Sequence, residues 1–121
     1  MQLAPDVASL GAGRRFVAQT LREWDVDEAR IESVQLVATE LLANAIVHAC
    51  SAPVLSLRTE GSDLVVGVAD ESRKLPVARA VTTDAAGGRG LLMVEALGDR
   101  WGVDTNGAGK VVWVIFSDAL D

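Results

Sequence analysis

Three polar side chains recur at four-residue steps along a segment that is otherwise almost wholly apolar. Glu40, Asn44 and His48 hold these positions, and in a helix they share one slowly turning face. A carboxylate one turn from a carboxamide can orient a water molecule or hold a hard metal ion. The alternative is a surface face that carries an ordinary polar pair. The helix alone leaves both interpretations open, because burial of such groups is costly only if nothing satisfies them.

The segment that positions these side chains is predicted to be a long helix over Asp27 to Cys50, which contains neither Pro nor Gly. Asp27 can cap its first turn. Apolar residues at three- and four-residue steps predict the side that faces the core: Ile31, Val34, Ala38, Leu41, Ala45 and Ala49. Cys50 is the only cysteine, so no internal disulfide can form. We expect it to be a small hydrophobic residue at the helix end rather than a nucleophile.

The overall composition indicates one globular domain over residues 1–121, with half of its residues hydrophobic. The net charge of −6 argues against a general nucleic-acid surface, which needs a basic patch. No apolar run reaches membrane-spanning length and no signal-peptide pattern is present, so we expect a cytoplasmic protein without a membrane segment.

A second helix is expected before the long one, with Asp6 as a candidate cap. Gly11 and Gly13 weaken its first turns, which favours a start nearer Arg14. Three arginines give this helix a basic face, which is either an interaction surface or simple solvation: Arg14, Arg15 and Arg22.

The second half of the chain alternates between strand patterns and turns. Four strands are predicted, in two hairpins: Val54–Glu60 with Leu64–Ala69, and Arg100–Thr105 with Val111–Phe116. Between the hairpins lie a long loop, Arg73–Gly88, of the kind that often forms a lid, and a short helix, Leu91–Leu97. Runs of strands predict the α/β class, as a two-layer sandwich of a mixed, mostly antiparallel sheet with helices on one face.

Two further features have the chemistry of a nucleotide site. Gly88-Arg89-Gly90 opens a helix, where glycines let backbone amides approach an anion and an arginine adds a charge-assisted hydrogen bond. Asp70 ends an apolar strand and can accept from the exocyclic amine of a base. Taken singly, the first is more often a plain turn and the second more often a cap.

Taken in order, these features resemble the ATP-binding fold that gyrase and histidine kinases share, known as the Bergerat or GHKL fold. Within it the chain is most similar to bacterial anti-sigma-factor serine/threonine kinases and related regulatory ATP-binding proteins. The segment Glu40-Leu-Leu-Ala-Asn44-Ala-Ile-Val-His48 matches their N box. Gly88-Arg-Gly90-Leu-Leu-Met-Val-Glu-Ala-Leu-Gly-Asp99 matches their second glycine box. The resemblance covers essentially the whole chain.

The resemblance implies a role for each matched residue. Asn44 would ligate Mg²⁺ and Glu40 would orient or deprotonate the attacking hydroxyl. Asp70 would receive the adenine amine. Gly88 and Gly90 would contact phosphate through their backbone, while Arg89 would reach the γ-phosphate. His48 is expected to fix the end of its helix.

The sequence departs from the family in two places. The first glycine box is normally Asp-x-Gly-x-Gly, whereas this chain reads Asp70-Glu71-Ser72-Arg73-Lys74. The threonine that the family carries after the glycine of its last turn is here Lys110, which leaves Lys110 among the nucleotide-binding positions. Both changes bear on nucleotide affinity more than on the catalytic pair.

The function that the resemblance implies is an anti-sigma factor and serine/threonine kinase with ATP and Mg²⁺ as cofactors. Its partners would be a sigma factor and an anti-sigma-factor antagonist of the STAS type, bound by a homodimer through surfaces that include Arg14. Two alternatives remain: a non-catalytic ATP-sensing regulatory module, and a detached catalytic domain that acts on histidine. The absence of a phosphoacceptor helix segment argues against an orthodox histidine kinase.

Overall fold

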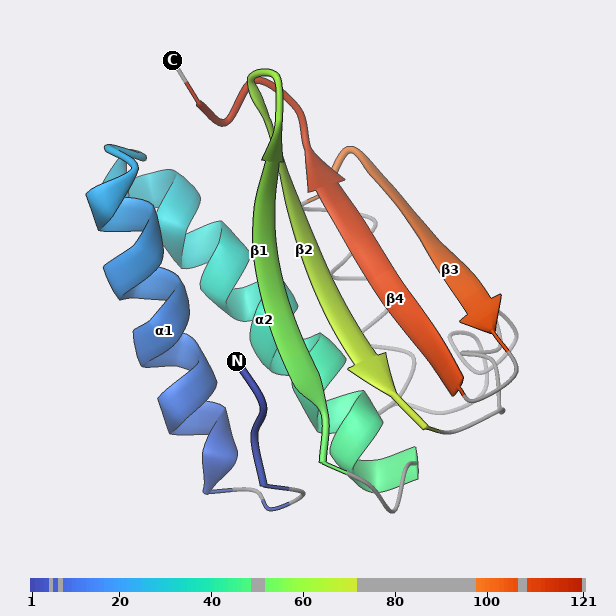
Figure 1. Cartoon of the computed structure of the whole chain (residues 1–121). Coiled ribbons are helices and arrows are strands. Elements are labelled where there is room, and N and C mark those ends of the chain that lie inside the picture. Colours follow the sequence, from blue (N-terminus) through green and yellow to red (C-terminus); the bar gives the residue numbers. More distant parts are fainter. Residues whose placement is uncertain (5, 7, 49–51, 72–97, 107–108, 121) are drawn as a thin grey trace, which may run out of the picture.

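The computed structural model describes residues 1–4, 6, 8–48, 52–71, 98–106 and 109–120. Two helices, α1 (Ser9–Glu23) and α2 (Glu28–His48), are followed by two hairpins, β1 (Val54–Glu60) with β2 (Asp63–Asp70) and β3 (Arg100–Asn106) with β4 (Gly109–Phe116). The described strands form one sheet in the order β1-β2-β4-β3, antiparallel throughout. Both helices lie on one face of this sheet (Figure 1). The predicted two-layer α/β sandwich is therefore confirmed.

The start of α1 differs from the prediction, because the helix begins at Ser9 and includes both glycines. Gly13 is buried, and a Cβ atom there would lie 2.5 Å from Cδ1 of Leu42 on α2. The glycine therefore permits a close approach of the two helices, which outweighs its low helix propensity. Asp6 does not cap the helix: its carboxylate accepts from the Ala8 N–H at 2.9 Å and shapes the turn before it.

The connection between the helices is a Schellman motif. The Val26 N–H donates to the Leu21 carbonyl at 2.9 Å, and the Asp25 N–H donates to the Arg22 carbonyl at 3.1 Å. Asp25 takes the left-handed position with φ of 59°, a place usually held by glycine. The predicted cap of α2 is confirmed, since the Asp27 carboxylate accepts from the Arg30 N–H at 3.0 Å.

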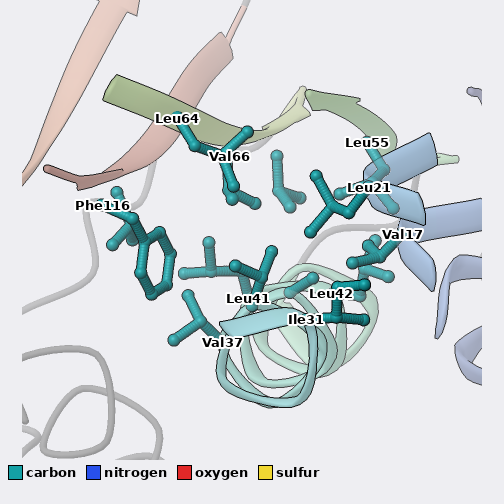
Figure 2. Close-up of a cluster of buried hydrophobic side chains, with 14 of the residues drawn as sticks. Val17, Leu21, Ile31, Val37, Leu41, Leu42, Leu55, Leu64, Val66 and Phe116 are labelled. Carbon is teal, nitrogen blue, oxygen red and sulfur yellow. The ribbon is translucent and has the colours of Figure 1, made fainter. Parts of the chain in front are cut away.

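The core lies between the helices and the sheet (Figure 2). Every described member of the predicted apolar stripe of α2 is buried, from Ile31 to Ala45. On β2 and β4, alternate side chains enter the same core, and the largest of them is Phe116, with no exposed surface. These contacts hold α2 against the sheet along its length. None of the described helices is long and apolar enough to span a membrane.

Candidate functional site

Glu40 and Asn44 lie on α2 between turns that are buried in the core. Leu41, Leu42 and Ala45 beside them are almost fully buried, whereas both polar residues are partly exposed. Within the described part of the chain, neither side chain makes a hydrogen bond or an ion pair. The prediction that the two share a face is consistent with their helical spacing in α2. A carboxylate and a carboxamide are thus held on a rigid helix with their polar atoms available to a ligand.

Asp70 and Lys110 form a buried ion pair at the end of the sheet. They are direct cross-strand partners on β2 and β4. The Lys110 Nζ donates to Asp70 Oδ1 at 3.1 Å, and the side chains are only 6% and 2% exposed. Both residues continue the alternation of core-facing positions on their strands, so both side chains project toward the helix layer.

Gly109 holds the two strand ends close together. A Cβ atom at this position would collide with the Asp70 carbonyl oxygen and would lie 2.8 Å from the Cα atom of Glu71. Only glycine lets the backbone of β4 begin so close to the end of β2. β4 begins at Gly109, two residues before the start of the predicted strand, and its register places Lys110 opposite Asp70.

These elements converge at one end of the sandwich. Figure 1 shows the carboxyl-terminal half of α2, the end of β2 and the start of β4 at the same end of the molecule. The described candidates Glu40, Asn44, Asp70 and Lys110 come from these three segments. The site thus combines two polar side chains on a helix, without partners among the described residues, with a buried charge pair on the sheet.

The other predicted site residues are distributed differently. Gly88, Arg89 and Gly90, together with the predicted loop and short helix around them, lie outside the described residues, as does the side chain of His48. Arg14 is exposed on α1, with its carbonyl accepting from Gln35 Nε2 at 3.0 Å. It belongs to the helix surface and not to the Glu40–Asn44 face.

The predicted basic face of α1 is smaller than its three arginines suggest. Arg22 pairs with Glu28 at 2.9 Å, and this contact raises the pKa of the guanidinium and lowers the pKa of the carboxyl, in both cases first through the hydrogen bond between them. Arg14 and Arg15 are exposed, and within the described residues neither side chain has an acidic partner. They are the cations of this helix that remain available to another molecule.

The Asp70–Lys110 pairing is the feature of the site that sequence reasoning missed. A lysine at the start of the strong apolar run Val111–Phe116 was the available signal, since a buried ammonium needs a partner. The identity of that partner depends on the strand order, in which β4 lies between β2 and β3.

Comparison of the sequence with known families decides the identity of the domain. A family model described as the histidine kinase-like ATPase domain matches residues 3–116. The chain belongs to this family. The resemblance that the N box and the glycine box indicate is thereby confirmed at the level of the histidine kinase-like ATPase domain.

Solved structures agree with this assignment. The blue-light-activated histidine kinase EL346 of Erythrobacter litoralis is 27% identical, with a TM-score of 0.60 over 78% of this chain and 32% of the other. The histidine kinase domain from the same EL346 protein is 26% identical, with a TM-score of 0.53 over 72% of this chain and 44% of the other. The chain therefore spans less than half the length of either structure. Among curated proteins, no sequence matches.

Proposed function

We propose that this histidine kinase-like ATPase domain binds Mg²⁺-ATP and transfers its γ-phosphoryl group to a hydroxyl of a partner protein. The observation that carries the proposal is the pair of Glu40 and Asn44, which are partly exposed on a buried helix and unpaired within the described residues. Such groups remain stable at a packed surface when a ligand or water satisfies them. A hard cation prefers the oxygen ligand that Asn44 offers.

In this reaction Asn44 would hold Mg²⁺, which would supply positive charge to neutralise the phosphates. Glu40 accepts the proton of the attacking hydroxyl as its oxygen bonds to the γ-phosphorus and ADP leaves. Asp70 accepts from the base. The family resemblance implies that the backbone of Gly88 and Gly90 and the side chain of Arg89 would complete the phosphate site.

Replacement of Glu40 by glutamine tests this role. Glu40→Gln preserves size and hydrogen bonding but removes the base, so we expect normal ATP affinity and a transfer rate lower by roughly 10²–10⁴-fold. Glu32→Gln is the matched control, because Glu32 is an exposed acid on the same helix. A Glu40→Gln protein that labels its partner at the wild-type rate would exclude Glu40 as the base.

Replacement of Asn44 by aspartate tests the nucleotide site itself. Asn44→Asp is nearly isosteric and adds a negative charge beside the phosphates, so we expect a large loss of Mg²⁺-ATP affinity without loss of the fold. Calorimetry with circular dichroism measures both properties. Unchanged affinity in a folded Asn44→Asp protein would place the nucleotide elsewhere.

The partner that the family resemblance favours is a sigma factor together with an anti-sigma-factor antagonist, bound by a cytoplasmic homodimer. Arg14 supports a protein surface on α1, because it is exposed on a chain with net charge −6. A guanidinium can pair bidentately with an acidic residue of such a partner. We expect Arg14→Ala to weaken partner binding by about 1–2 kcal/mol while ATP affinity stays unchanged.

A matched control for the partner surface is Arg58→Ala, because Arg58 is an exposed arginine on β1 that pairs with Glu60 at 3.2 Å. Partner affinity measured by biolayer interferometry separates the two sites. Equal affinities for wild type, Arg14→Ala and Arg15→Ala would move the partner surface away from α1.

Two other functions are each favoured by a specific observation. The Asp70–Lys110 pair and the missing first-box glycines favour a module that senses ATP without transfer. The similar structures are named histidine kinases, which favours transfer to histidine. Labelling native lysate with Mg²⁺-ATP and mapping the phosphosites discriminates among the three, since phosphohistidine is acid-labile and phosphoserine is not.

A further inference from the structure

The ammonium of Lys110 is buried, and among the described residues most of its hydrogen-bonding capacity is unused. Its side chain is 6% exposed and donates to Asp70 Oδ1 at 3.1 Å. A lysine ammonium has three N–H donors, so two remain without a side-chain acceptor among the described residues. A buried ion pair offsets its desolvation only when further hydrogen bonds satisfy the remaining protons. Within the described residues, the ammonium therefore still has donors for another acceptor.

The position of the pair indicates what that acceptor belongs to. Both side chains continue the core-facing positions of their strands and so project toward the helix layer. The carboxyl-terminal half of α2 lies at the same end of the sheet (Figure 1). That half carries Glu40 and Asn44. Asp70 is the residue proposed above to accept from the base, so Lys110 would lie beside the edge of the base with donors that no described residue occupies.

We propose that Asp70 and Lys110 read the base together, and that the site accepts guanine nucleotides as well as adenine nucleotides. Adenine presents an exocyclic amine donor next to the N1 acceptor, whereas guanine presents the O6 acceptor next to the N1–H donor. A lone carboxylate accepts from the adenine amine and repels guanine O6. A carboxylate with an adjacent ammonium offers one acceptor and one donor, and so can pair with the donor and the acceptor of either base.

The two bases would contact Asp70 and Lys110 through different atoms. With adenine, the amine donates to Asp70 and Lys110 donates to N1. With guanine, N1–H donates to Asp70 and Lys110 donates to O6. Lys110 thus sets the purine selectivity of the site, and a neutral side chain at this position restores discrimination against guanine, because O6 then faces the negative carboxylate without a positive charge beside it.

This inference rests on the proposed nucleotide site, and the experiment separates the two. The affinities of ADP and GDP with Mg²⁺ are measured by competition with a fluorescent adenine nucleotide in the wild type, in Lys110→Thr and in Lys110→Arg. Arg58→Thr is the matched control, since it removes an exposed cation from a strand outside the site.

We expect GDP to bind the wild type within roughly tenfold of ADP, and Lys110→Thr to widen that ratio by at least roughly tenfold, the scale of one lost base contact. Lys110→Arg keeps the cation and is expected to keep GDP binding. Arg58→Thr should leave the ratio unchanged.

The wild-type ratio decides the inference even if Lys110→Thr does not fold. A wild type that prefers ADP by more than roughly tenfold overturns the inference but leaves the ATP site standing, as does a folded Lys110→Thr protein with an unaltered ratio. If neither nucleotide binds to the wild type, both the inference and the proposed function fail.

Discussion

Replacing each of the two glycines of α1 by alanine should change stability in opposite directions. Alanine is favoured over glycine in a helix interior by about 1 kcal/mol, so this term is the same at Gly11 and Gly13. The surroundings differ. A Cβ atom at Gly11 meets only Nη1 of Arg15 at 3.3 Å, and this exposed side chain can move aside. Gly11→Ala should therefore stabilise the protein by about 0.5–1 kcal/mol.

At Gly13 the added methyl group enters a packed region. It would lie 2.5 Å from Cδ1 of Leu42, with Leu3 and Leu55 at 3.5 Å and 3.6 Å on other sides. Leu42 has no exposed surface and cannot move into solvent. Overpacking of a core typically costs 1–3 kcal/mol, which exceeds the gain in helix propensity. We therefore expect Gly13→Ala to lower the free energy of unfolding by about 1–2 kcal/mol.

Urea denaturation followed by circular dichroism measures both changes against the wild type. A thermal scan should move in the same direction, by roughly 3–6 °C for each kcal/mol in a domain of this size. Each variant serves as the control for the other, because they make the same substitution two positions apart. A Gly13→Ala protein as stable as Gly11→Ala would refute the close approach of α1 and α2.

Three further outcomes follow from individual contacts. Phe116→Ala should lose about 3–5 kcal/mol of stability in the same denaturation assay, because its ring is fully buried between the layers. Gly109→Ala should destabilise the sheet end and weaken nucleotide binding together, since a methyl group collides with the Asp70 carbonyl; a folded variant with normal ATP affinity would contradict this. NMR titration should give Glu28 a lowered pKa that returns toward its ordinary value in Arg22→Gln. That contact supports folding above the unfolded pKa of Glu28 and is lost as pH falls through the lowered folded value, and the effect is small because both groups are exposed.

Much of the fold could be predicted from local patterns. The Asp27 cap, the apolar stripe of α2 and the alternation in the four strands each depend on residues close together in the chain, and the structure confirms them within a few positions. The start of α1 could not be predicted this way. Whether Gly13 ends a helix or lets two helices touch depends on Leu42, which is distant in sequence.

In the candidate site, too, local features could be predicted from the sequence and long-range contacts could not. Glu40 and Asn44 were identifiable because their spacing on one helix is a local property. The partner of Lys110 was not, because it depends on which strands are neighbours. The Schellman motif after α1 could not be predicted for another reason. Asp25 holds the left-handed position that glycine usually takes, so the residue types of the turn did not indicate the motif.

The strand order also has a consequence for how the chain folds. In each hairpin the closing residues are near neighbours, Glu60 with Asp63 and Asn106 with Gly109, so both hairpins can form through local contacts within microseconds. The central β2–β4 pairing joins Asp70 to Lys110 across a much longer stretch of chain, and bringing its two ends together has a larger entropic cost. We therefore expect this pairing to limit the folding rate. The rate-limiting step of folding would then bring together the carboxylate and the ammonium of the proposed base site.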